Sequence, residues 1–163
     1  MYLKKNIVFV LVGALIVVLS SCWSGKKAAD KKVGLLKGLV LVNVLDKDFF
    51  DDCHIKGSIN IPFMEVKDAD KKIDKDAEIV AYCSNYMCTA SSSARTQLMD
   101  MGYKKVYVYE GGTAEWLQKG YPVTGPSKKG YLKMEMPKPA GEEKKYMLSA
   151  EELKKKMEEN KIL

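Results

Sequence analysis

The sequence predicts an α/β fold with a mainly parallel central sheet and helices on both of its faces. Aliphatic runs alternate with helical segments along the chain, which is the pattern of parallel strands joined by crossover helices. The first run, LVLVNV at residues 39–44, is almost continuously aliphatic, as in a strand that is buried on both faces. The length of 163 residues, 47% of them hydrophobic and 29% charged, fits one domain with short extensions.

Four strands and the segments between them can be placed from hydrophobic spacing. The strands are expected at residues 39–44, 58–63, 78–83 and 105–110. The helical segments are expected to be a helix or turn over 46–53, a weakly helical segment over 64–75, a helix over 89–101 and a short helix that carries Trp116. The helix expected over 89–101 has an apolar face, because Ala90, Ala94 and Leu98 recur at a spacing of four residues.

The C-terminal part divides into a connection and a final element. Prolines break up the chain after the fourth strand, so residues 125–145 are expected to form an extended connection. Ser149 and Glu152 have the spacing of a capping box, which predicts the start of a last helix. We therefore expect residues 146–163 to form a strand and a helix that pack on a core over residues 35–124.

The N-terminus has the order of a bacterial secretory signal. Residues 1–6 are short and basic, and residues 7–19 are apolar or small and carry no charge. This run is shorter than the roughly 20 residues that a membrane-spanning helix needs. A Leu-Ser-Ser-Cys sequence that ends at Cys22 follows it and resembles the lipobox, in which the cysteine is acylated and the chain is cut before it.

The lipobox resemblance implies a location for the mature protein. Residues 1–21 are then a lipoprotein signal peptide, Cys22 is the lipidated first residue, and residues 22–34 are a tether. Palmitate and related acyl chains would hold the protein in the bacterial cell envelope, on the non-cytoplasmic (periplasmic) side of a membrane. The alternative is an uncleaved N-terminal anchor in which Cys22 is incidental.

Cys83 is the strongest candidate for chemistry in the sequence. It ends an aliphatic strand, and in an open parallel sheet ligands bind at the carboxyl ends of the strands. N–H groups in the following loop and at the next helix N-terminus would attract negative charge, which predicts a lowered thiol pKa. Taken alone, Cys83 could also be an inert core cysteine. The loop residues are Ser84, Asn85, Tyr86, Met87, Cys88 and Thr89.

Two further cysteines and one histidine accompany Cys83. With Cys22 acylated, an odd number of thiols remains, so at least one free thiol is expected. Cys88 closes the same short loop, so it could pair with Cys83 or act as a resolving thiol for a persulfide on it. Its other role would be packing at the start of the helix. We expect Cys53 to be a small buried residue and His54, the only histidine, to be structural.

Charge and spacing argue against several other functions. The net charge of +6 is spread over lysines that mix with acidic residues, without a basic stripe of interleaved aromatics, so nucleic-acid binding is not expected. Cys83 and Cys88 are separated by four residues, which is not the usual zinc spacing, so no metal site is predicted. No cofactor is predicted either.

Four blocks of the chain resemble the rhodanese-like domain family, in a single-domain, lipoprotein form. They occur in order between about residues 35 and 124. The blocks are VNVL at 42–45 with HIKGSINIP at 54–62, IVAYC at 79–83, GYKKV at 102–106 with EGG at 110–112, and Trp116 with GYPV at 120–123. The resemblance implies a rhodanese fold in which Cys83 is the nucleophile that carries a persulfide and residues 84–88 cradle its sulfur.

The chain departs from the family at the loop. Family members that use thiosulfate often place cations there, but residues 84–89 include no Arg or Lys, so the sulfur donor stays open. Related phosphatases have an arginine where this chain has Thr89, so phosphate-ester chemistry is not expected.

A second departure concerns the order of elements. Rhodanese domains commonly open with a strand and a helix of the form Ile-Ser-x-Glu-Glu-Leu, and here a similar sequence, YMLSAEEL, stands at residues 146–153. This indicates a circularly permuted arrangement in which the C-terminal element takes the place of the opening one. An unrelated amphipathic helix and an exchange of the element between protomers are the alternatives.

The sequence as a whole predicts an exported, lipid-anchored sulfurtransferase with a persulfide on Cys83. Its partners would be a small sulfur-containing donor or thiol acceptor, and the membrane through its lipid; the oligomeric state is not predicted. Two alternatives belong to other classes. One is a thiol redox protein that cycles a Cys83–Cys88 disulfide, and the other is a non-catalytic binding module with a rhodanese fold.

Overall fold

The computed structural model describes residues 34–135, 137–138 and 145–163. The predicted signal peptide at 1–21, the lipidation site Cys22 and the predicted tether up to residue 33 lie outside these residues. Within the described ranges, no helix has the length and apolar character that crossing a membrane requires.

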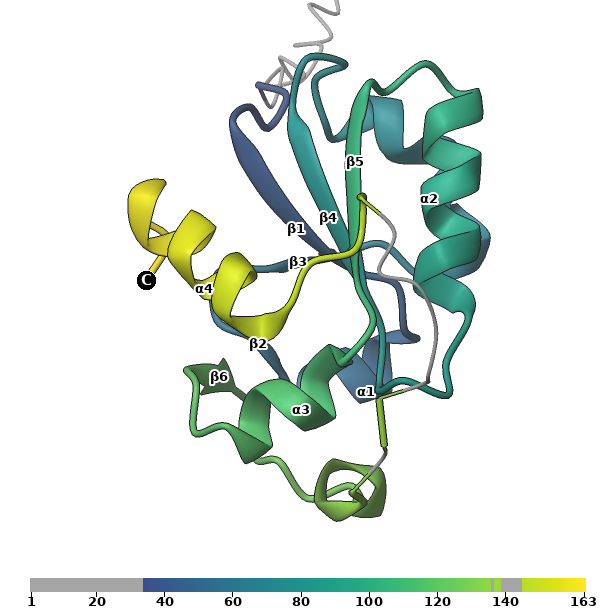
Figure 1. Ribbon diagram of the computed structural model, residues 1–163. Helices are drawn as coiled ribbons and strands as arrows, with labels where there is room; N and C mark the ends of the chain where they lie inside the picture. Colours follow the sequence, from purple (N-terminus) through teal and green to yellow (C-terminus); the bar gives the residue numbers. More distant parts are fainter. Residues whose placement is uncertain (1–33, 136, 139–144) are drawn as a thin grey trace, which may run out of the picture. The chain divides into compact units, whose positions relative to one another are not determined.

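A four-stranded parallel sheet forms the centre of the domain, in the strand order β3-β1-β4-β5 (Figure 1). Four of the five residues of β1 are buried, and the same is true of β4, as expected of strands covered on both faces. The predicted α/β fold with a mainly parallel sheet is therefore confirmed. The strands are β1 (Leu39–Asn43), β3 (Ile59–Asn60), β4 (Glu78–Tyr82) and β5 (Lys105–Tyr109).

Helices cover both faces of this sheet because successive strand residues point to opposite sides. Val40 and Val42 of β1 pack in one apolar cluster with α2 (Ala90–Asp100) and η1 (Phe63–Lys71). Leu41, between them, packs in a second cluster. That cluster includes residues of α3 (Gly112–Gln118) and α4 (Ala150–Glu159).

A short antiparallel pair lies outside the main sheet and consists of β2 (His54–Ile55) and β6 (Val123–Thr124). In the chain, β2 comes directly after α1 (Lys47–Asp52). The expected extended connection over 125–145 needs correction at η2 (Gly130–Lys133), a 3-10 helix. Leu132 of η2 is buried in the domain.

The C-terminal element packs against the same sheet within one chain. Met147 forms a parallel bridge with Val108 of β5, in which the N–H of Leu148 donates to the carbonyl of Val108 over 2.9 Å. Ser149 and Glu152 form the capping box that starts α4. The element therefore occupies the sheet edge beside β5. Circular permutation of the family order stays a prediction.

Candidate active site

Cys83 directly follows β4, and residues 84–89 connect it to α2. The loop therefore begins at the carboxyl end of a central strand, where ligand sites of parallel sheets lie. The chain reaches α3 just after the neighbouring strand β5 ends, so α3 begins beside the same edge (Figure 1).

The first turn of α3 holds the start of this loop. The N–H of Thr113 donates to the carbonyl of Cys83 over 3.0 Å, and the Thr113 hydroxyl donates to the same oxygen over 3.2 Å. The N–H of Ala114 donates to the carbonyl of Ser84 over 2.9 Å. These N–H groups belong to the first turn of a helix, where amides are free to bind partners outside the helix.

Gly112 makes this close contact between α3 and the loop possible. Its φ is +61°, a left-handed conformation that side chains rarely adopt. A Cβ at this position would lie 2.6 Å from the carbonyl oxygen of Cys83 and 2.8 Å from the backbone nitrogen of Asn85. In the sequence, Gly112 stands out only as part of the EGG block at 110–112, because its contact with the cysteine loop depends on tertiary packing.

The Cys83 thiol faces hydrogen-bond acceptors. Its side chain is fully buried, and its Sγ–H donates to the carbonyl of Cys88 over 3.2 Å. Its sulfur also lies 3.5 Å from the hydroxyl oxygen of Ser91 and 4.0 Å from the carbonyl oxygen of Asn85. Hydrogen bonding to Cys88, followed by burial, raises the pKa of Cys83. The expected low pKa at Cys83 is therefore wrong for this arrangement of the loop.

Cys88 is the thiol that the loop stabilises as an anion. The hydrogen bond from Cys83 is the main cause that lowers the pKa of Cys88 to about 5, against the opposing effect of burial. The backbone N–H groups of Ala90 and Ser84 also donate to its sulfur and lower the pKa further. Ala90 begins α2, so the positive end of the helix dipole acts here. The pKa values of the two thiols are thus shifted in opposite directions, that of Cys83 upward and that of Cys88 downward.

The remaining loop residues form a compact turn. The side-chain oxygen of Asn85 accepts the N–H of Met87 over 3.0 Å, and its carbonyl accepts the N–H of Cys88 over 3.0 Å. Thr89 stands at the N-cap of α2 but makes no side-chain cap hydrogen bond. Met87 is 72% exposed at the surface of the loop. The structure therefore brings all the predicted site residues between 83 and 89 into one turn.

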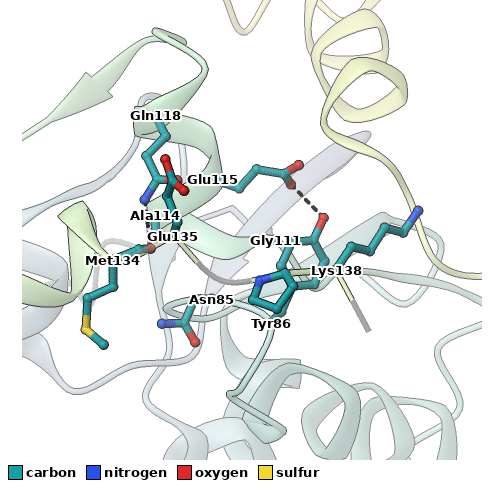
Figure 2. Close-up of a pocket in the computed structure, with 10 residues that line it drawn as sticks. Asn85, Tyr86, Gly111, Ala114, Glu115, Gln118, Met134, Glu135 and Lys138 are labelled. Carbon is teal, nitrogen blue, oxygen red and sulfur yellow. Dashed lines mark hydrogen bonds between the residues drawn. The ribbon is translucent and has the colours of Figure 1, made fainter. Parts of the chain in front are cut away.

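A pocket of about 530 Å³ adjoins the loop (Figure 2). Asn85 and Tyr86 form part of its wall, and Glu115 of α3 lies opposite. The Tyr86 hydroxyl donates to the Glu115 carboxylate over 3.0 Å, and the Tyr109 hydroxyl donates to the same oxygen over 2.8 Å. Burial and the nearby Glu115 charge raise the pKa of Tyr86, so it stays a neutral donor.

Cys53 and His54 have structural surroundings. Cys53 is fully buried, and its sulfur accepts a hydrogen bond from the Ser127 hydroxyl over 3.2 Å. Burial raises the pKa of Cys53. The His54 ring stacks on Phe50 at 3.8 Å between centroids, and its Nδ1 lies 2.7 Å from the Phe50 carbonyl oxygen. These contacts agree with the structural roles that the sequence predicts for both residues.

Comparison of the chain with known proteins identifies the family to which this fold and its cysteine loop belong. The family model of the Rhodanese-like domain matches residues 25–119, which is more than half of the chain. The chain belongs to the rhodanese-like domain family.

The curated relatives include proteins named thiosulfate sulfurtransferase GlpE. The one from Pseudomonas savastanoi pv. phaseolicola is 34% identical over 80 residues, which cover 49% of this chain and 74% of the relative. The one from Coxiella burnetii is 28% identical over 80 residues and is covered to 73%. Among solved structures, the BH2092 protein from Bacillus halodurans matches with a TM-score of 0.52 and 27% identity, over 55% of this chain and 66% of that one.

Replacing Gly112 with alanine should disturb the loop as well as strain the backbone. The Gly120→Ala variant is the matched control, because Gly120 also has a positive φ of +72° but nothing within 4 Å of a Cβ. Strain alone costs about 1–2 kcal/mol, so Gly112→Ala should lower the free energy of unfolding by clearly more than the control in urea titrations. Equal losses in the two variants would contradict the proposed close contact.

The thiol pKa values predict the order of alkylation. At pH 6, a thiol with a pKa of about 5 is mostly thiolate, so iodoacetamide should label Cys88 before Cys83 and Cys53. Its rate should fall as the pH drops below 5, because protonation then removes the nucleophile. Peptide mass spectrometry at short reaction times measures the order, with Cys88→Ser as the control. Faster labelling of Cys83 would show that the charge resides on the other sulfur.

Proposed function

We propose that this protein is a sulfurtransferase that carries sulfane sulfur as a persulfide on Cys83. The observation that carries the proposal is the position of Cys83 at the end of β4, in a loop that α3 holds by its backbone, in a chain of the rhodanese-like family. A buried sulfur of this kind is shielded from water. The relatives named thiosulfate sulfurtransferase support the reaction class.

The loop has groups that can stabilise the product. When a donor transfers its sulfane sulfur, the donor S–S bond breaks and a new S–S bond forms on Cys83. The added sulfur lies about 2 Å from Sγ and carries the negative charge of the persulfide. The hydroxyl and N–H groups of Ser91, which lower the pKa of Cys83, are donors available for that charge. The N–H groups of Ser84 and Ala90, which lower the pKa of Cys88, lie in the same loop region.

The surroundings of the loop favour an organic persulfide over thiosulfate as donor. Thiosulfate is a dianion, and residues 84–89 provide no cationic side chain to hold it. The adjoining pocket is lined by two carboxylates, Glu115 and Glu135, and one ammonium group, that of Lys138. The pocket beside the loop therefore offers no excess of cationic groups that would hold a dianion.

The protein is also exported and lipid-anchored in this proposal, through acylation of Cys22. The basic segment, the apolar run and the Leu-Ser-Ser-Cys sequence support it. In a bacterial host, the Cys22→Ser variant should lose palmitate labelling and no longer fractionate with membranes, because the acyl chains are attached through the thiol. Wild-type labelling and fractionation of Cys22→Ser would contradict the lipoprotein proposal.

Loss of the Cys83 thiol tests the reaction itself. The Cys83→Ser variant should lose sulfur transfer from glutathione persulfide to a thiol acceptor. The reason is that a serine hydroxyl stays protonated at neutral pH and is a weak nucleophile. The Cys53→Ser variant, which removes another buried thiol, should keep the activity. Intact mass spectrometry of the wild type should show a gain of about 32 Da, one sulfur atom.

The same measurement separates the second candidate function, a thiol redox protein. The hydrogen bond between Cys83 and Cys88 favours that candidate, because the two sulfurs are neighbours. A loss of about 2 Da, the signature of a disulfide, without any gain of sulfur would replace the sulfurtransferase by this function. Full transfer by Cys83→Ser would refute both.

A further inference from the structure

The two thiols of the loop differ in access. Cys83 is fully buried in the core cluster that β1 and α2 share, whereas Cys88 is partly exposed at the other end of the loop. Cys88 therefore lies nearer the surface than Cys83, although it also packs against the same cluster. Reaching Cys83 directly would require the turn between residues 84 and 88 to open.

The two thiols also differ in nucleophilicity. The Cys88 sulfur accepts hydrogen bonds from the Ser84 and Ala90 amides, whereas Cys83 donates its proton to the Cys88 carbonyl over 3.2 Å. Thiolate is the form that attacks a sulfane sulfur. In the resting loop, the less buried cysteine is thus also the one whose pKa is lowered.

We infer that sulfur enters this protein through Cys88, which takes it from the donor and passes it inward to Cys83. This inference rests on the proposed persulfide at Cys83 and adds a second catalytic residue to that reaction. Cys88 lies beside Cys83, because the Cys83 Sγ–H donates to the Cys88 carbonyl over 3.2 Å, and each of the two side chains shifts the pKa of the other.

The first step is an exchange with an organic persulfide, R–S–SH. The Cys88 thiolate attacks the terminal sulfur, the S–S bond of the donor breaks, and its electron pair leaves on the donor thiolate. The proton of the transferred sulfur passes to that thiolate, so R–SH departs and Cys88 carries an anionic persulfide. The charge stays beside the amides of Ser84 and Ala90.

The second step returns Cys88 to its starting state. Cys83 gives its proton to the terminal sulfur of the Cys88 persulfide and attacks that sulfur as a thiolate. The S–S bond to Cys88 breaks, a new one forms on Cys83, and Cys88 recovers its electron pair as the thiolate. No reductant or oxidant is consumed, because the sulfane sulfur keeps its oxidation state.

The rate at which Cys83 acquires sulfur tests this route. The full chain is reduced and mixed with glutathione persulfide, and fragment mass spectra locate the added sulfur over time. Cys88→Ser should load Cys83 at least about tenfold more slowly than the wild type, because the exposed thiolate is gone. Cys53→Ser should load it at the wild-type rate, and Cys83→Ser should hold the added sulfur on Cys88. Cys88→Ala serves as a second variant if Cys88→Ser does not fold.

The outcomes separate this inference from the proposed function. Wild-type loading of Cys83 in both Cys88 variants would overturn the entry role and leave the Cys83 persulfide intact. If discharge to a thiol acceptor were slow in those variants, Cys88 would instead be the resolving thiol. Absence of sulfur from Cys83 in the wild type would refute the proposed function itself.

Discussion

The contact between the first turn of α3 and the backbone of Cys83 and Ser84 is the interaction on which the cysteine loop depends. It fixes the carbonyl groups at the start of the loop with three hydrogen bonds, two of them from Thr113. Gly112 is the condition for this contact, since any side chain there would overlap the loop backbone. Because α3 directly follows β5, the position of the loop is tied to the neighbouring strand of the sheet.

With its backbone held this way, the loop shifts the pKa values of its two thiols in opposite directions. Carbonyl oxygens of Asn85 and Cys88 lie beside the Cys83 sulfur and outweigh the donors of Ser91, while amides of Ser84 and Ala90 face Cys88. Acceptors favour the thiol and donors favour the thiolate, so neighbouring sulfurs in one turn acquire opposite character. A lone cysteine in such a loop would have no second sulfur to hold the charge. The pair is therefore what distinguishes this loop chemically.

The polar groups around the loop also limit the substrate. Cations that would hold a dianionic donor are missing from residues 84–89, and the Glu115 carboxylate is fixed at the pocket wall by two tyrosine hydroxyls. Family membership defines the fold, and in the proposed function these side chains would select among sulfur donors. The proposed preference for an organic persulfide follows from this charge balance.

Local spacing in the sequence was sufficient to predict the strands, the helix after Cys83, the Ser149–Glu152 capping box and the place of Cys83 at a strand end. These features depend on neighbours within a few residues, which hydrophobic periodicity and capping motifs report directly. The β2–β6 pair and the η2 turn could not be predicted this way. They depend on contacts between distant segments, such as Asp52 with the backbone at Lys128 and Lys129.

The sequence by itself determined that Cys83 and the loop over residues 84–89 lie at the carboxyl end of a central strand, because a cysteine that ends a buried parallel strand emerges at that edge of the sheet. Only the tertiary structure decided which of the two sulfurs carries the charge. That choice depends on where each side chain points once α3 has fixed the loop: Cys83 into the core, Cys88 toward the amides. The physical reason is that hydrogen bonds to a thiol are set by packing of segments far apart in the chain, which local spacing does not encode.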